Sequence, residues 1–246
     1  MSEFKFIGSI KNQDFSNRYA DIEGGCTSLV DCDFTNSIID NDSFKNGSRL
    51  DFINCNFTGA NIAWLSMFRF INCKFDSTYF GGNIPGPHFR AIINLPFASD
   101  FRNCLFTNCE FDGKEFFDSQ FYECRFIESK LTKTRFTKNS LNKVTFERCN
   151  LEGVRFEENE LNNTMFSSFM KDTRINSCQF FDSQFLNCNM EKTTIQNSEF
   201  HRCFMARNIT TNSKVTSCDF DVCRVNQDES LFSDCKFRGE GNYSMF

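Results

Sequence analysis

The sequence predicts an all-β solenoid in which a short strand and a turn repeat every five residues. Three observations support this prediction. The 246 residues include 34 Phe but only 4 Tyr and 1 Trp. Large apolar residues recur every five positions over long stretches, and a small residue stands two positions before most of them. Mean hydropathy is nevertheless negative, so we expect each Phe to occupy a defined dry site.

The clearest repeat lies in the middle of the chain. Its fourteen consecutive centres, each five residues after the last, are Phe101, Phe106, Phe111, Phe116, Phe121, Phe126, Leu131, Phe136, Leu141, Phe146, Leu151, Phe156, Leu161 and Phe166. A period of five matches neither the helix period of 3.6 nor the strand period of 2. The centre and the small residue are two apart, so they point to the same side of a short strand.

The repeat continues on both sides of this run with irregularities. After a one-residue deletion the centres are Ile175, Phe180, Phe185, Met190, Ile195, Phe200, Met205, Thr210, Val215, Phe220 and Val225. Phe232 and Phe237 then follow what we interpret as a two-residue insertion. The N-terminal third is noisier, with centres at Leu29, Phe34, Ile39, Phe44, Phe57, Ile62, Met67, Phe70, Phe75 and Phe80. The solenoid is therefore predicted from about residue 25 to about residue 240.

Cysteine usage follows the same register. Thirteen of the 14 Cys stand two positions before a centre, and only Cys26 is out of register. Neighbouring coils would hold the Cβ atoms of stacked Cys about 4.8 Å apart, beyond the mean of about 3.8 Å in disulfides. We therefore expect buried thiols that act as small apolar side chains. No CxxC pair is present, so neither a metal nor a cofactor is expected.

Units such as CNFTG at 55–59, CRFIE at 124–128 and CQFFD at 178–182 closely resemble the pentapeptide-repeat family. The resemblance covers most of residues 27–237 and is greatest to the Phe- and Cys-rich quinolone-resistance and microcin or albicidin immunity type. It implies a right-handed quadrilateral parallel β-helix with one pentapeptide on each of four faces. The chain would then form about 10–12 coils, with one interruption near 81–98.

A single domain with five parts is predicted. Residues 1–26 would form an N-terminal cap and an irregular first coil, 27–80 the N-terminal coils, 81–98 a loop or distorted coil, 99–238 the main β-helix and 239–246 a C-terminal tail or cap. The segment 81–98 holds all three prolines of the chain. Two interpretations remain open for it: a projecting loop, or a distorted coil, because the 21 residues from Phe80 to Phe101 equal one coil plus one residue.

Charge and composition limit the classes of function. Acidic residues number 32 against 27 basic ones. In the run from Phe101 to Phe166 the outward residues of all four faces mix both signs, so no basic stripe predicts direct nucleic-acid binding. No apolar run predicts a signal peptide or a membrane span, which favours the cytoplasm and leaves export without a cleaved signal open. Only two His are present, His88 in the interruption and His201 on the outside, and neither has an evident nucleophile partner. We therefore expect no enzyme.

Candidate partner-binding residues lie where the repeat is interrupted or acidic. His88, Phe89 and Arg90 lie in 81–98, and loops on rigid scaffolds often carry binding residues. Trp64 stands at an outward position just before the register changes. A third group comprises Glu157, Glu158 and Glu160, which could imitate phosphates.

The family resemblance implies a bacterial protein-binding β-helix, and two hypotheses follow. The more specific is a DNA mimic that binds a type II topoisomerase, gyrase or topoisomerase IV, and protects it from an antibiotic or toxin. The alternative is a general interaction scaffold or a secreted bacterial effector. The sequence leaves the partner and the oligomeric state undetermined.

Overall fold

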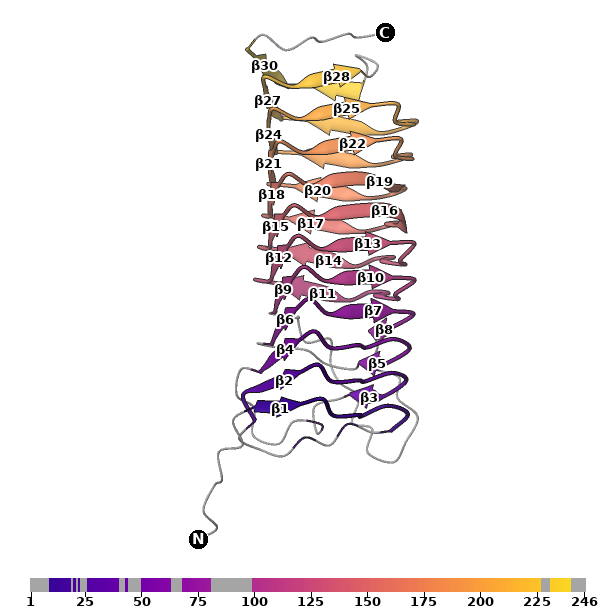
Figure 1. Ribbon diagram of the computed structural model, residues 1–246. Coiled ribbons are helices and arrows are strands. Elements are labelled where there is room, and N and C mark those ends of the chain that lie inside the picture. Colours follow the sequence, from indigo (N-terminus) through magenta and orange to yellow (C-terminus); the bar gives the residue numbers. More distant parts are fainter. Residues whose placement is uncertain are drawn as a thin grey trace.

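The computed structural model describes residues 9–18, 20, 22, 26–39, 43, 50–62, 68–80, 99–226 and 231–239. In these ranges the chain forms parallel β-strands that stack coil on coil into a rod, which confirms the predicted all-β solenoid (Figure 1). The part of the chain that the structure describes contains no helix able to span a membrane.

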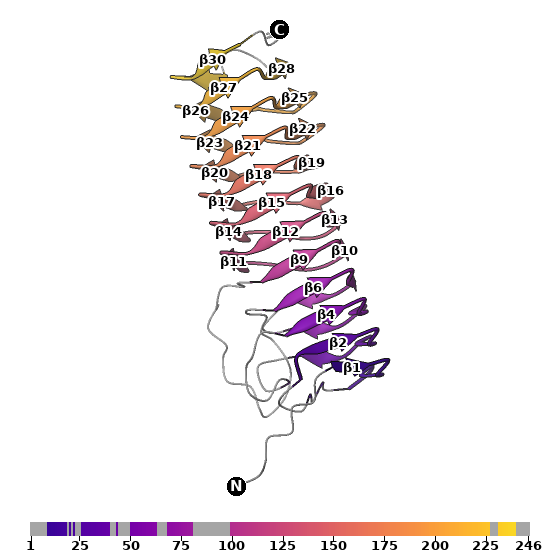
Figure 2. The same ribbon diagram turned by 60° about the vertical axis from the view of Figure 1, so that its left-hand side comes forward.

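The strands form four sheets, which we call faces A to D. Face A consists of β1 (Ser9–Lys11), β2 (Ser28–Val30), β4 (Asp51–Ile53), β6 (Arg69–Ile71), β9 (Asp100–Arg102), β12 (Gln120–Tyr122), β15 (Ser140–Asn142), β18 (Glu160–Asn162), β21 (Gln179–Phe181), β24 (Glu199–His201), β27 (Asp219–Asp221) and β30 (Lys236–Arg238), as Figure 2 shows. Face B consists of β7 (Lys74–Asp76), β10 (Leu105–Thr107), β13 (Arg125–Ile127), β16 (Thr145–Asn150), β19 (Met165–Phe169), β22 (Gln184–Leu186), β25 (Phe204–Ala206) and β28 (Arg224–Asn226).

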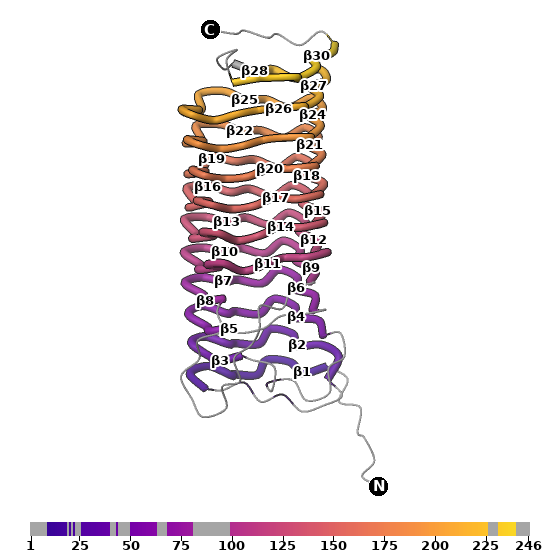
Figure 3. The backbone as a smooth tube through the Cα atoms, turned by 180° about the vertical axis from the view of Figure 1, so that it is seen from behind, coloured from indigo at the N-terminus to yellow at the C-terminus, as the bar shows by residue number. Residues whose placement is uncertain are grey.

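The other two faces have fewer strands. Face C begins with β3 (Ile38–Ile39), β5 (Asn61–Ile62) and β8 (Tyr79–Phe80) and continues as single bridges, such as Glu110 to Lys130. Face D consists of β11 (Glu115–Phe117), β14 (Arg135–Thr137), β17 (Arg155–Glu157), β20 (Arg174–Asn176), β23 (Thr194–Gln196), β26 (Lys214–Thr216) and β29 (Phe232–Ser233). Figure 3 shows the chain visiting the faces in turn and rising from coil to coil.

The core consists of columns of side chains that run along the rod. Phe136 pairs in register with Phe116 and Phe156, and their ring centroids are 5.1 and 5.0 Å apart in parallel stacks. Phe136 also meets Phe146 of the opposite column edge-on, at 6.1 Å and 81°. All of these rings are buried. The predicted opposed Phe columns are therefore confirmed, and they leave the interior filled.

The small inward residue satisfies a backbone carbonyl of the coil below. The Ser129 hydroxyl donates to the Phe106 carbonyl (3.2 Å) and the Thr134 hydroxyl to the Phe111 carbonyl (2.8 Å). The Cys149 thiol lies 3.3 Å from the Phe126 carbonyl in the same arrangement. Cys, Ser and Thr share this position because each is small and carries a donor. All fourteen thiols are free, and all but that of Cys235 are buried.

The turns between faces rely on left-handed backbone. Among the residues that the structure describes, thirty other than glycine have positive φ near 50–58°, and more than half of them are Asn or Asp. These two residue types tolerate the left-handed region because their short polar side chains can hydrogen-bond locally. Asn54, Asn72 and Asn103 stack at one such corner, with side-chain hydrogen bonds of 3.1 and 2.9 Å. The sequence therefore needs few glycines to turn these corners.

Strand pairing corrects four details of the predicted register. The first paired coil begins at Ser9, because β1 pairs with β2, so the predicted start near residue 25 was too late. Phe52, not predicted as a centre, pairs with Leu29. Phe232 pairs with Val215, 17 residues earlier, so a coil is three residues short where we expected an insertion. The predicted one-residue deletion is confirmed, since Ile175 pairs with Phe156. Phe44 and Met67 lie outside the described residues.

The fourth correction concerns the flanks of 81–98. Phe70 pairs directly with Phe101, and Phe75 with Phe106. No further coil can lie between directly paired strands. The interpretation of the interruption as one coil plus one residue is therefore wrong.

Candidate protein-interaction surface

The interruption at 81–98 is best measured from its flanks. Phe80 stacks on Phe111 with centroids 4.3 Å apart, so the two occupy equivalent places in successive coils. Eighteen residues, 81–98, then connect Phe80 to Ser99, whereas seven residues, 112–118, connect Phe111 to Ser119 in the next coil. The segment thus carries eleven residues more than a regular coil has there.

Four predicted contact residues lie outside the described residues: His88, Phe89, Arg90 and Trp64. Their role in binding stays a prediction. The projecting loop that we predicted for His88, Phe89 and Arg90 likewise stays a prediction.

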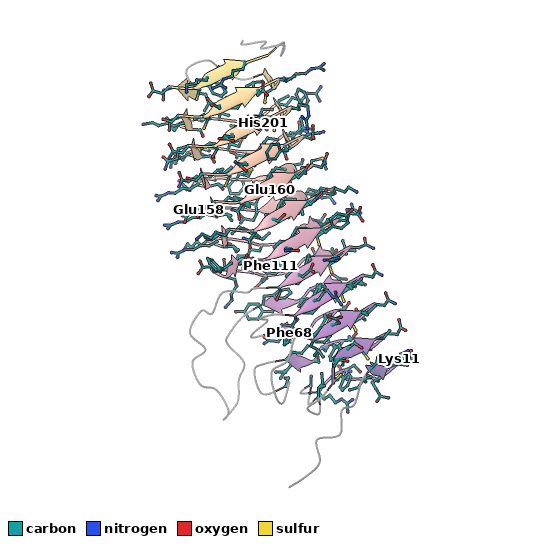
Figure 4. All side chains as sticks on the ribbon, turned by 90° about the vertical axis from the view of Figure 1, so that its left-hand side faces the viewer. Lys11, Phe68, Phe111, Glu158, Glu160 and His201 are labelled. Atoms are coloured by element: carbon teal, nitrogen blue, oxygen red, sulfur yellow. The ribbon has the colours of Figure 1, made fainter. Side chains whose placement is uncertain are left out.

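The three predicted glutamates come together in one coil, at the edge between faces D and A. Glu157 ends β17, Glu158 occupies the left-handed corner with φ 56°, and Glu160 begins β18. Figure 4 shows Glu158 and Glu160 beside one another on the outside of the rod. The Lys138 ammonium lies 3.6 Å from the Glu158 carboxylate, so one of the three charges is partly neutralised.

This acidic cluster is only one coil deep. The strand partners of Glu157 are Thr137 and Asn176, and those of Glu160 are Ser140 and Gln179. A DNA duplex carries one negative charge for every 1.7 Å or so of its axis. The cluster alone therefore imitates a local phosphate group rather than a length of duplex.

Several other outward charges form ion pairs from one coil to the next. Arg148 pairs with Glu128 at 2.9 Å and Lys143 with Glu123 at 2.8 Å. The hydrogen bond from Lys143 lowers the pKa of the Glu123 carboxyl below its usual range. Such exposed pairs contribute little to stability, but they explain why both signs appear on every face.

A longer acidic row, which the sequence analysis missed, runs up face A. Glu160, Gln179, Glu199 and Asp219 are successive strand partners, so three carboxylates lie within four coils. The Arg238 guanidinium lies 3.3 Å from the Asp219 carboxylate at the upper end of the row. His201 stands beside this row, with its ring stacked on Phe181 at 5.0 Å and 3.4 Å from the Asp221 carboxylate. The predicted outward position of His201 is confirmed. Comparing outward residues in steps of 19 or 20 would have found this row.

Two exposed aromatic side chains, also missed, border face A on its two sides in the coil of β11 and β12. Phe117 ends β11 on face D and Tyr122 ends β12 on face A, with 37% and 41% of their surfaces exposed. The Lys138 ammonium lies 5.8 Å from the Phe117 ring centroid, and that of Lys143 lies 5.3 Å from the Tyr122 ring. Phe117, Lys138 and Glu158 lie at the corner between faces D and A, and Tyr122 and Lys143 lie at the corner between faces A and B. We call these five residues the face A border. Exposed aromatics beside cations are typical of protein-binding surfaces.

The described residues offer no evident site for a metal or for nucleophilic chemistry. Among residues 9–80, 99–226 and 231–239, so far as the structure describes them, no group of three His, Cys, Asp or Glu could hold a metal ion. Burial raises the pKa of the Cys149 and Cys188 thiols to about 11, which keeps them protonated near neutral pH. Their position in the filled interior favours a structural role.

Comparison with known proteins gives a family match. Residues 99–170 match the model of the pentapeptide repeat region, and no curated protein matches the chain. Among solved structures, the chain is similar to the pentapeptide-repeat protein HetL of the cyanobacterium Nostoc sp. strain PCC 7120, which is involved in heterocyst differentiation regulation. The sequence identity is 9% and the TM-score is 0.44, and the match covers 95% of this chain and 85% of HetL. The chain is also similar to a trypsin-treated M102R form of QnrB1, a plasmid-mediated fluoroquinolone resistance protein. Here the sequence identity is 13% and the TM-score is 0.39, and the match covers 94% of this chain and 91% of QnrB1.

Proposed function

This chain is a pentapeptide-repeat protein, and from that premise we propose that it is a non-enzymatic rod that binds a protein partner through its outer faces. The observation that carries the proposal is the filled interior. Centres such as Phe136 and Leu141 are fully buried, and polar inward groups such as Asn139 are hydrogen-bonded within the core. Chemistry that needs a polar pocket therefore has no place inside the rod, whereas the outer faces offer a rigid surface that needs little reordering on binding.

The face A border is the best-supported contact surface in the described part of the chain. Its two aromatic rings can be buried against a partner, and its flanking Lys and Glu side chains can form a polar rim. All its residues lie on strands or corners of paired coils. Binding there would cost little conformational entropy because the backbone is already fixed.

The specific partner that we propose is a type II topoisomerase, gyrase or topoisomerase IV, which the protein would protect in the bacterial cytoplasm from an antibiotic or toxin. The sequence resemblance to the quinolone-resistance and immunity type suggests this partner. The acidic row of Glu160, Glu199 and Asp219 supports it, since carboxylates in line on a rigid rod can imitate phosphates. Segment 81–98 would carry part of the contact.

A supercoiling assay with gyrase and a fluoroquinolone tests this proposal. The expected result is that the full chain restores supercoiling in the presence of the drug. The triple variant E160Q, E199Q and D219N should protect at least about tenfold less well, because three phosphate-like charges are lost. The matched control is E123Q, E128Q and D182N, which removes as many charges from ion-paired carboxylates that lie outside the row and should protect like the parent chain.

A second variant separates the rod from the interruption. Replacing 81–98 with the seven residues 112–118 of the next coil would make the coil regular. Reduced protection by this variant would assign part of the contact to 81–98, and unchanged protection would assign all of it to the rod.

The alternative function is a general interaction scaffold or a secreted effector. The exposed Phe117 and Tyr122 favour it, since aromatic contacts need no phosphate-like surface. If the full chain neither inhibits nor protects gyrase and topoisomerase IV, the topoisomerase proposal is wrong and this alternative replaces it. Capture of a partner from a bacterial lysate that is lost with the F117S/Y122S variant would then support the face A border.

A further inference from the structure

Three arginines stand directly above one another on face D. Arg135, Arg155 and Arg174 are the first residues of β14, β17 and β20, and each is the strand partner of the next. Their Cα atoms are thus separated by the coil spacing of about 4.8 Å. Arg135 and Arg174 are exposed and Arg155 is half-buried, so the column, which we call the arginine ladder, faces outward.

The ladder differs from the ion-paired arginines of neighbouring coils. Arg148 and Arg202 each pair with a carboxylate one coil below, at 2.9 and 2.7 Å. Within the described residues, none of the three ladder guanidinium groups has an ion pair or a side-chain hydrogen bond. Like charges directly opposite one another on paired strands destabilise a sheet. The fold therefore gains nothing from this stacking, which points to a role outside the fold.

The surroundings leave the ladder accessible from one side. Gly153, the corner residue two positions before Arg155, has no side chain, and the atom nearest to the place of a Cβ there is the Lys133 Cγ, at 3.4 Å. The nearest acids along the strands are Glu115, in the coil below Arg135, and Glu157, two residues after Arg155. Neither forms an ion pair with a ladder arginine within the described ranges, so the guanidinium groups keep their donors available.

We propose that the arginine ladder is a docking site for an acidic segment of a partner protein, bound as an extended strand with carboxylates on alternate residues. Guanidinium groups match carboxylates in a bidentate geometry. The ladder spans about 10 Å, and alternate side chains of an extended strand recur every 6.6–6.8 Å or so, so two carboxylates fall within its reach. A nucleic acid is disfavoured because the chain carries a formal charge of −5.

This inference rests on the proposed protein-binding function but not on the topoisomerase as the partner. The arginine ladder is positively charged, whereas the acidic row is negatively charged. The ladder proposal and the topoisomerase proposal can therefore fail separately. Loss of gyrase protection in the assay above would leave the ladder untouched.

Fluorescence anisotropy tests the ladder directly. The probe is a fluorescein-labelled peptide Ser-Glu-Ser-Glu-Ser-Glu-Ser, titrated with the full chain at low salt, where exposed charges are least screened. The variant R135Q/R155Q/R174Q should weaken binding about tenfold, as expected for the loss of three exposed ion pairs. The matched control R125Q/R148Q/R202Q removes the same charge from arginines that are already paired and should weaken binding less than about twofold.

Thermal unfolding guards against a folding artefact. The ladder variant should unfold at the same temperature as the parent chain or higher, because stacked like charges are removed. If it unfolds lower, the single variant R155Q serves instead, with an expected loss of about threefold in affinity. Equal weakening by the matched control would mean general electrostatics and would overturn the proposal. So would the absence of measurable peptide binding, or tighter binding of a single-stranded oligothymidylate than of the peptide.

Discussion

Truncation of Phe136 tests the inward packing most directly. Its fully buried ring stacks on Phe116 and Phe156 and meets the edges of Phe121 and Phe146, with centroids 5.0–6.1 Å away. Phe136→Ala removes all four contacts at once and leaves a cavity that fixed backbone on both sides prevents from collapsing. We expect a loss of about 4–5 kcal/mol in the free energy of unfolding, the upper part of the usual range for a buried Phe.

Urea unfolding followed by far-UV circular dichroism measures this loss, and two variants calibrate it. Phe136→Leu should cost about 1–2 kcal/mol, because Leu already serves as a centre in the neighbouring columns. Lys138→Ala, two residues later on the outside, removes an exposed ion pair with Glu158 and a contact near the Phe117 ring and should cost less than about 1 kcal/mol. Equal losses at Phe136 and Lys138 would refute the assignment of inward and outward positions.

Two further predictions concern the small inward position. Burial raises the pKa of Cys149 from 9.0 to about 11, so between these values the folded state keeps a proton that the unfolded state releases, and the free energy of unfolding falls as pH rises. Cys149→Ser, which places Ser between Ser129 and Ser168, should make this fall shallower by about 1.4 kcal/mol per pH unit. Urea unfolding from pH 8 to 10.5 or so measures the slope. An unchanged slope would contradict the assigned pKa. Asn159 donates to the Phe136 carbonyl and accepts from the Asn139 amide, so Asn159→Ala should cost about 2–4 kcal/mol by leaving both groups unsatisfied. A cost no larger than that of Asn159→Ser would show that water or another group replaces the amide.

The regular part of the rod could be predicted from the sequence because one number determines it. From Phe101 to Phe166 the period never changes, so every centre, small residue and column follows from the spacing of five. Irregular places are ambiguous. The seven residues from Val225 to Phe232 equal one unit plus two residues or two units minus three, and only the pairing of Phe232 with Val215 decides between them.

The candidate contact surfaces were harder to predict for a related reason. Glu157, Glu158 and Glu160 are close in sequence, so their cluster was visible at once. The arginine ladder and the acidic row join residues 19 or 20 apart, and the one-residue deletion before Ile175 shifts the interval within each column. Opposite charges in adjacent columns also average to near zero when a whole face is counted. An unpaired column becomes visible only when each side chain is matched with its actual neighbours.

The uniform register has a consequence for how the rod forms. Almost every strand pairs with one about 20 residues away, as Phe121 does with Leu141, so each closure involves a loop of one coil however long the chain is. That separation is about 0.08 of the 246 residues, a relative contact order usual for helical bundles rather than for β-sandwiches. Because closure entropy depends on loop length, adding coils lengthens the rod without making any single closure harder. Folding can therefore propagate from coil to coil by local steps, although every strand pair is parallel.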